Sequence, residues 1–146
     1  MNLEQDASLA PFNTFGLDVR ARYLAHVQDN DDMAEAFAFT REKGLPHLIL
    51  GGGSNVLLTK DFPGVVIRIE SKGIQQVDDT ASGVIIRAMA GEHWHSFVMH
   101  TLEHDWGGLE NLSLIPGNVG ASPMQNIGAY GVEVKDVFHS LDAYHI

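Results

Sequence analysis

Apolar residues change their spacing twice between positions 23 and 50, and each spacing predicts a different element. Residues 23–28 predict a short strand. Residues 30–43 follow helical spacing, and Gly44 ends the helix in the left-handed conformation. The N-cap and the acidic first turn come from Asn30, Asp31 and Asp32, and the buried side carries Met33, Ala36, Phe37 and Thr40. With a second apolar strand at 47–50, residues 23–50 form a predicted β-α-β unit.

Shorter apolar runs predict the remaining regular elements. Strands are expected at 56–58, 65–69, 74–77 and 84–89, with turns at Pro63-Gly64 and at residues 81–83. A helix is expected from Gly91 to about His104, and its buried side carries Phe97, Val98 and Leu102. Residues 136–146 alternate like a half-buried strand and stop without a turn or polar tail. That ending favours a fragment of a longer chain.

Residues 107–131 form a long loop that is apolar and rich in glycine. Its glycines and prolines prevent any long regular element. We expect burial of its apolar side chains, namely Leu112, Leu114, Ile115, Val119, Met124 and Ile127. Because glycine has no Cβ, a flat ligand can lie directly against such a backbone. We interpret the loop as the floor of a cofactor site, and a buried structural crossover is the alternative.

A second glycine-rich loop, residues 51–55, directly follows the predicted strand at 47–50. Consecutive glycines after a strand present successive N–H groups in a concave arrangement that suits a phosphate. The loop lacks the Gly-Lys-Ser/Thr of a P-loop, and Val56 replaces the last glycine of a G-x-G-x-x-G motif. Together with the loop at 107–131, it predicts a dinucleotide site made from two loops.

Other polar residues give weaker signals. His100 and His104 lie four residues apart on the second predicted helix, but no third ligand has suitable spacing, so no metal site is predicted. Asp61, Asp78 and Asp79 are interpreted as turn residues. Residues 11–18 predict a compact turn anchored by Phe12 and Phe15, with either a binding role or a purely structural one.

Composition narrows the function classes. The chain has 146 residues, 45% of them hydrophobic, and a formal net charge of −10, with no cysteine. This chain is long enough for one domain or two small lobes. Clustered Lys and Arg are absent, which argues against nucleic acid, so an anionic ligand must be held mainly by backbone amides. The lack of an apolar membrane-spanning run and of a signal peptide favours a cytoplasmic protein without a membrane partner, and no obligate protein partner is inferred.

Five motifs resemble those of the UDP-N-acetylenolpyruvoylglucosamine reductase family, part of the FAD-binding superfamily of vanillyl-alcohol-oxidase (PCMH) type. They are Asn13-Thr14-Phe15-Gly16, Gly51 to Asn55, Gly91 to His95, Leu109 to Leu112 and the long run from Ile115 to Gly131. The resemblance implies an α+β, two-lobed FAD-binding module that is truncated at its C-terminus. Residues 1–70 would form the first lobe and residues 71–146 an incomplete second lobe, without the substrate-binding domain.

The resemblance also implies a reaction and a set of site residues. NADPH would reduce a non-covalent FAD, which would then reduce the enolpyruvyl group of a UDP-sugar during peptidoglycan precursor synthesis. The pyrophosphate contacts would be Gly51, Gly52, Gly53, Ser54 and Asn55. The flavin contacts would be Ile115, Pro116, Gly117, Gly120, Ala121, Ser122, Met124, Ile127 and Gly128. No catalytic residue is assigned within the chain, which is therefore expected to be inactive alone.

Two alternatives remain open at this point. One is another flavin oxidase or dehydrogenase of the same superfamily, although relatives of that kind often attach FAD through His or Cys. This sequence has no cysteine, and no histidine lies inside either glycine loop. The other is a nucleotide-binding module or fragment without catalytic activity.

Overall fold

A computed structural model describes residues 1–81 and 83–145 of the chain. Within this part the chain divides into two units, one made of Met1–Ser71 with the residues from Tyr144 on, the other of Lys72–Ala143. Both units combine helices with strands, so the predicted α+β class is confirmed. Among the described residues, no helix has both the length and the apolar character needed to cross a bilayer.

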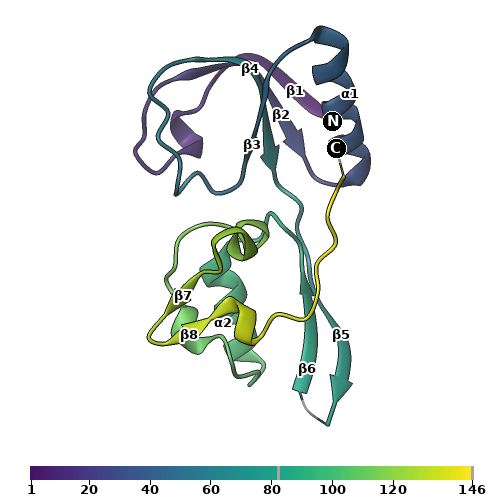
Figure 1. The fold of residues 1–146 in the computed structure, drawn as a ribbon, viewed down its shortest axis with the longest axis vertical. Helices are drawn as coiled ribbons and strands as arrows, with labels where there is room; N and C mark the ends of the chain where they lie inside the picture. Colours follow the sequence, from purple (N-terminus) through teal and green to yellow (C-terminus); the bar gives the residue numbers. More distant parts are fainter. Residues whose placement is uncertain (82, 146) are drawn as a thin grey trace. The chain divides into compact units, whose positions relative to one another are not determined.

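The first unit is built on a four-stranded sheet, counted over the described residues. Its strand order is β1 (Asn2–Ser8), β2 (Arg20–Val27), β4 (Phe62–Ile69) and β3 (His47–Leu50). β1 is antiparallel to β2, whereas β2, β4 and β3 are mutually parallel (Figure 1). The predicted β-α-β unit is present as β2, α1 (Asn30–Lys43) and β3, with β4 inserted between its two strands. The carboxyl ends of the three parallel strands therefore share one edge of the sheet.

Helix α1 has the predicted extent but a different N-cap. The side chain of Asp29 accepts a hydrogen bond from the N–H of Asp32 at 2.9 Å, so Asp29 is the cap and the predicted cap at 30–32 is wrong. Gly44 ends the helix with a φ of +60°, as predicted. The buried side contains Ala36, Phe37 and Thr40, with Met33 packed at its margin.

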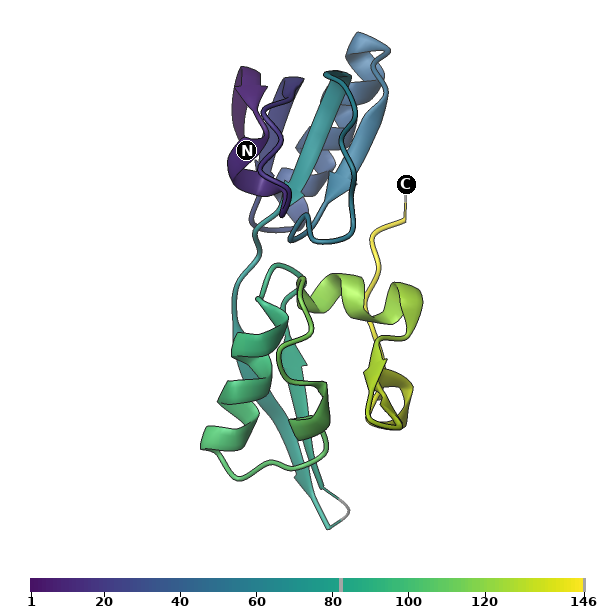
Figure 2. The same cartoon turned by 90° about the vertical axis from the view of Figure 1, so that its left-hand side faces the viewer.

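Two apolar clusters hold the first unit together, one on each face of the sheet. Helix α1 covers one face of the sheet (Figure 2). The cluster beneath it contains Ala25, Val27, Ala36, Phe37, Val65 and Ile67. The cluster on the opposite face contains Ala7, Leu9, Ala21, Leu24, Leu50, Leu58 and Val66. Phe12, in the short helix η1 (Ala10–Phe12), packs against this second cluster. The sheet is therefore buried on both faces, with the chain around η1 and Leu58 covering the face without a long helix.

The second unit begins with the hairpin β5 (Ile74–Thr80) and β6 (Gly83–Ala88), followed by α2 (Trp94–Glu103). These two predicted strands and the second predicted helix are confirmed. The rest of the unit consists of the short elements η2 (Glu110–Leu112), η3 (Val119–Gln125), β7 (Gly128–Ala129), β8 (Val132–Glu133) and η4 (Val134–Asp136). Its core contains Trp94, Phe97, Val98, Leu112, Ile127 and Val134.

The predicted turn at Pro63-Gly64 is wrong, because both residues lie inside β4. Ala21 pairs with Phe62 and Tyr23 pairs with Val65, so one residue of β2 faces two residues of β4. Pro63 and Gly64 lie in a bulge, where the missing proline N–H is tolerated. A Cβ on Gly64 would lie 2.1 Å from the carbonyl oxygen of Pro46, so glycine fits this position. The other predicted turn, at 81–83, includes Ser82, which lies outside the described residues.

Two predicted strands are also wrong. Residues 56–59 have no regular secondary structure, and Val56 and Leu58 contribute to the core from a loop instead. Residues 137–145 likewise form no helix or strand, and Ile146 lies outside the described residues. Phe138 and Leu141 are 43% and 57% exposed, and no described strand pairs with this segment. Alternation predicts a strand only where a neighbouring strand supplies hydrogen bonds.

Two smaller sequence predictions fail in the second unit. Leu102 is 38% exposed, and the last buried position of α2 is Thr101. Asp78 and Asp79 lie within β5 and pair with β6, so neither is a turn residue. In the first unit Asp61 does lie in a loop, and its carboxylate accepts a hydrogen bond from the N–H of Arg20 at 2.8 Å.

Candidate functional site

Two glycine-rich loops are candidate ligand-binding segments, and each is described within its own unit. The first loop, residues 51–55, follows the carboxyl end of β3. Ligands of open parallel sheets commonly bind at the carboxyl ends of the strands. Within the described part of the chain, the N–H groups of Gly51 to Ser54 donate no hydrogen bond to protein. Four successive donors are therefore free to bind an anion.

Gly53 fixes the shape of this loop. Its φ is +67°, a conformation that favours glycine. Its Cα lies against the backbone of Phe12 and Asn13 in the turn at residues 11–18. A Cβ at this position would lie 2.0 Å from the carbonyl oxygen of Phe12 and 3.0 Å from the Cα of Asn13. Because both atoms belong to backbone, no side-chain rotation could relieve the overlap. A glycine is required here by the protein's own chain.

The turn at residues 11–18 packs against the loop and is held by its own hydrogen bonds. The amide nitrogen of buried Asn13 donates to the carbonyls of Leu9 at 2.7 Å and Leu17 at 3.0 Å. The N–H of Thr14 donates to the carbonyl of Gly53 at 3.1 Å. Phe15 is 66% exposed, so the expectation that it anchors the turn is wrong, and Phe12 is its aromatic anchor.

The second loop lies against the segment that leads into α2. Trp94 N–H donates to the carbonyl of Gly117, Val119 N–H to that of Glu92, and Gly120 N–H to that of Ala90, each at 2.9 Å. A Cβ on Gly120 would lie 2.6 Å from the Cβ of Ala90. Glycine is therefore required at position 120 for these two segments of the chain to pack this closely.

Further polar contacts hold the same segment. The indole Nε1 of Trp94 donates to the carbonyl of Leu112 at 2.7 Å. The carboxylate of Glu92 accepts from the N–H of Gly73 at 2.6 Å and forms an ion pair with Lys72 at 3.5 Å. Glu92 belongs to the motif Gly91 to His95, but the sequence analysis assigned it no structural role. Its position between a glycine and the start of a helix was the available signal.

The side chains of the second loop divide into buried and exposed sets. Ser122 and Ile127 are buried in the unit's own core, and the Ser122 hydroxyl donates to the carbonyl of Val119 at 2.8 Å. Leu112 is also buried, whereas Leu114 and Met124 are 77% and 87% exposed, so their predicted burial is wrong. The exposed apolar side chains are available for contact with an aromatic ligand.

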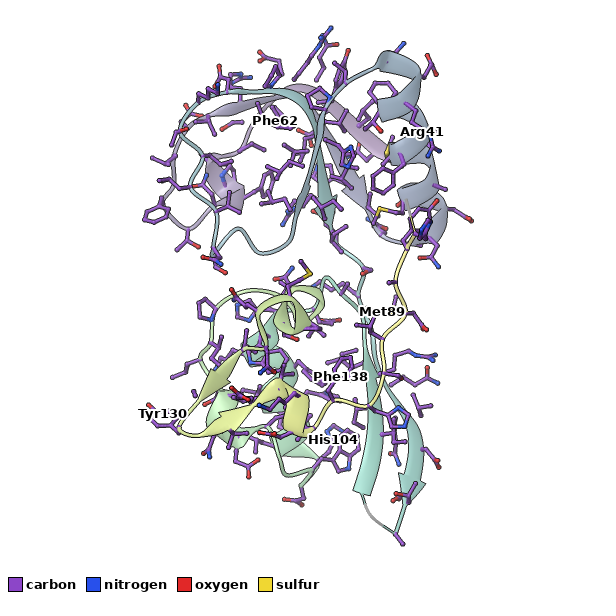
Figure 3. The ribbon with its side chains drawn as sticks, viewed as in Figure 1. Arg41, Phe62, Met89, His104, Tyr130 and Phe138 are labelled. Carbon is purple, nitrogen blue, oxygen red and sulfur yellow. The ribbon has the colours of Figure 1, made fainter. Side chains whose placement is uncertain are left out.

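The hairpin formed by β7 and β8 ends this loop. It borders a surface hollow of about 410 Å³, lined by Asn126, Gly128, Ala129, Gly131, Val132 and Glu133. Tyr130 lies at the hairpin tip with a φ of +53° and is 91% exposed (Figure 3). A bulky residue in the left-handed region carries backbone strain. The hairpin therefore holds an aromatic ring in solvent despite that strain.

The titratable groups near the second loop have structural partners. Hydrogen bonds from its own backbone N–H and from that of Gly108 lower the pKa of the Glu110 carboxyl. At the end of α2, the ring Nδ1 of the C-cap residue His104 lies 2.8 Å from the carbonyl oxygen of His100, and the two ring centroids are 4.4 Å apart. Across residues 1–81 and 83–145, no group of three or more metal-ligating side chains is found.

Comparison with known proteins identifies relatives of the whole described fold. The sequence profile of the FAD binding domain family matches residues 21–145. A Pseudomonas aeruginosa protein named UDP-N-acetylenolpyruvoylglucosamine reductase is 59% identical over 143 residues, which are 98% of this chain and 42% of that protein. The protein of the same name from Chromobacterium violaceum is 51% identical over 136 residues, covering 93% of this chain and 40% of that protein.

A solved structure gives the same result for the fold. The crystal structure of UDP-N-acetylenolpyruvylglucosamine reductase from Thermus caldophilus matches with a TM-score of 0.68 and 26% identity. The match covers 93% of this chain and 46% of that one. The chain thus spans less than half the length of these relatives.

Proposed function

The chain belongs to the FAD binding domain family, and from that premise we propose that it holds FAD non-covalently as the flavin module of a UDP-N-acetylenolpyruvoylglucosamine reductase. The observation that carries the proposal is the loop at 51–55, whose N–H groups from Gly51 to Ser54 are free and whose Gly53 is fixed by the protein's own backbone. A diphosphate needs several donors arranged in advance, and this loop offers them without a lysine or arginine.

The two loops would contact different parts of the cofactor. Gly51, Gly52, Gly53, Ser54 and Asn55 would bind the diphosphate through backbone amides. Ile115, Pro116, Gly117, Gly120, Ala121, Met124 and Gly128 would lie along the ring system, while Ser122 and Ile127 would act through their backbone because their side chains are buried. In this proposal residues 1–70 and 71–146 are the two FAD-binding lobes.

When bound, FAD supplies the redox chemistry of the proposed reaction, with NADPH as its hydride donor. The residues of this chain contribute binding and orientation. The packing of Gly120 against Ala90 and the indole hydrogen bond of Trp94 fix the second loop, and fixed geometry is a protein's main contribution to flavin chemistry. We assign no proton donor to this chain. The relatives' name supports a UDP-sugar as the substrate. A place in peptidoglycan precursor synthesis and a cytoplasmic location are further parts of the proposal.

A ligand series tests the proposal. The apoprotein is titrated with FAD and with riboflavin, and binding is followed by flavin fluorescence. Binding of ADP is measured by its competition with FAD. We expect FAD to bind most tightly and ADP to compete, because both carry the diphosphate. Riboflavin, which lacks phosphate, should bind much more weakly. Equal binding of FAD and riboflavin, or no binding of FAD, would refute the role of the loop at 51–55.

A further inference from the structure

Arg68 occupies a distinctive place beside the first loop. It lies near the carboxyl end of β4, in register with His26 of β2 and with Leu50 of β3. Leu50 is the last residue of β3, so the loop at 51–55 begins directly beside Arg68. Its side chain is 30% exposed, which makes it a half-buried charge at the edge where the loop leaves the sheet.

Arg68 is held in one orientation by a chain of polar contacts. Its guanidinium forms an ion pair with Glu70, whose carboxylate also lies 3.0 Å from Nδ1 of His26. Nε2 of the same imidazole lies 3.1 Å from the carboxylate of Glu4 on β1. Only 12% of the His26 side chain is exposed. These contacts link three neighbouring strands and restrict the movement of the guanidinium.

The fixed guanidinium lies over the ring of Phe12. The Arg68 Cζ is 4.0 Å from the ring centroid, well within the distance of a cation–π contact. The backbone of Phe12 is in turn the surface against which Gly53 packs, since its carbonyl oxygen lies 2.0 Å from where a Gly53 Cβ would be. A hydrogen bond from Thr14 to the Gly53 carbonyl joins the two segments directly. Phe12 therefore connects Arg68 to the loop.

We propose that Arg68 is a positioning residue for the loop at 51–55 and acts through Phe12. Stacking on the ring holds the turn around Phe12 in place, and this turn defines the backbone conformation of Gly53. The consequence for FAD affinity rests on the proposed function, whereas the consequence for loop order does not. An exposed ion pair alone would contribute little to either.

A double-mutant cycle tests whether Arg68 acts through Phe12. FAD dissociation constants are measured for the wild type, Arg68→Met, Phe12→Leu and the double variant. Loss of a cation–π contact should weaken FAD binding about fivefold in Arg68→Met. In the Phe12→Leu background the same substitution should have no further effect, because the ring it acts through is gone. Independent, multiplying effects of the two substitutions would overturn the proposal.

Two further variants separate stacking from charge and from general destabilisation. Arg68→Lys keeps the positive charge but loses the planar group that stacks on Phe12 and pairs with Glu70, so it should bind FAD more weakly than the wild type. Full affinity in Arg68→Lys would show instead that Arg68 attracts the diphosphate by its charge. Arg22→Met removes another guanidinium of the first unit, 5.8 Å from the ring of Tyr23. It should leave FAD binding unchanged, and an equal loss there would also refute the proposal.

A measurement without FAD keeps the inference independent of the proposed function. Amide hydrogen exchange of Thr14 reports its hydrogen bond to the Gly53 carbonyl. Exchange at Thr14 should be about fivefold faster in Arg68→Met than in the wild type, and also faster in Arg68→Lys. Unchanged exchange would overturn the positioning role. A wild type that binds no FAD would refute the proposed function, while the exchange rates would still decide the role of Arg68.

Discussion

In the first unit the backbone N–H groups of Gly51 to Ser54 donate no hydrogen bond to described protein atoms, whereas in the second unit those of Val119 and Gly120 donate to Glu92 and Ala90. Both loops are rich in glycine, yet glycine has a different purpose in each. At Gly53 it allows a left-handed conformation that leaves neighbouring donors free, and at Gly120 it allows one segment to pack closely on another. Glycine-rich sequence therefore indicates close backbone approach, and only the hydrogen bonds show whether a ligand or the protein itself is the partner.

The strongest test of this difference is substitution of Gly53. Gly53→Ala should abolish FAD binding and lower the free energy of unfolding by on the order of 3 kcal/mol, because its Cβ would meet fixed backbone 2.0 Å away. Gly44→Ala is the matched control, since Gly44 has a φ of +60° but open space around it. That control should cost about 1 kcal/mol from strain alone and leave FAD binding intact. Equal effects in a urea titration would show that Gly53 matters only for its conformation.

Gly120 provides the corresponding test in the second unit. Gly120→Ala should cost about 1–3 kcal/mol in unfolding free energy, because its Cβ would lie 2.6 Å from the Cβ of Ala90. Removing the opposing methyl group in Gly120→Ala/Ala90→Gly should restore part of that loss. Urea denaturation measures both variants. A double variant less stable than the sum of its single substitutions would contradict close packing as the reason for this glycine.

Trp94 tests whether the second loop depends on bonds within the protein. Trp94→Phe removes the donor to the Leu112 carbonyl and leaves that buried acceptor unpaired, at a cost of about 1–2 kcal/mol. Trp106→Phe, on a half-buried ring stacked on His104, should change stability by less than about 0.5 kcal/mol. ADP affinity should stay unchanged in both variants, since ADP would use the first loop alone. Weaker ADP binding in Trp94→Phe would contradict the expectation that ADP uses the first loop alone.

A smaller effect, confined to the first unit, is expected at alkaline pH. Hydrogen bonds to Asp32 and Glu35, 2.7 Å and 2.8 Å away, raise the pKa of the Met1 amino group from 8.0 to about 10. A raised pKa in the folded state means that the stabilisation is complete below pH 8 and is lost as pH rises through 10. The melting temperature should therefore fall over this window, and less so in Glu35→Gln. Identical profiles for the two proteins would rule out this ion pair as the cause.

The sequence was most informative where local rules decide the structure. Helix α1, its glycine C-cap and the strands β2, β3 and β4 follow from spacing and cap chemistry. Strand β1 is not predictable from apolar spacing because it is a mainly polar edge strand. The sequence Pro63-Gly64 predicts a turn, because only the partner strand distinguishes a bulge from a turn. The strand expected at 136–146 failed for the same reason.

The candidate site was predictable to a similar extent. Both glycine loops were found from composition and motif. The need for glycine at position 53 is predictable from the loop, and its φ of +67° agrees. The packing of Gly53 on Phe12 and the roles of Glu92 and Arg68 are not predictable, because each depends on a residue distant in sequence. Exposure of Leu114 and Met124 was also unpredictable, since an apolar side chain in a loop is buried only if the fold provides a neighbour.

In the proposed function, free backbone donors of the first loop bind the diphosphate of FAD. NMR of the labelled protein can follow the amide resonances of both loops during titration with a ligand. With FAD and with ADP, the amide protons of Gly51 to Ser54 should shift strongly as they gain an anionic acceptor, while those of Val119 and Gly120, already bonded to the protein, should shift little with ADP. Riboflavin should leave the first group unchanged. Resonances of Gly51 to Ser54 that stay in place while FAD binds would contradict the claim.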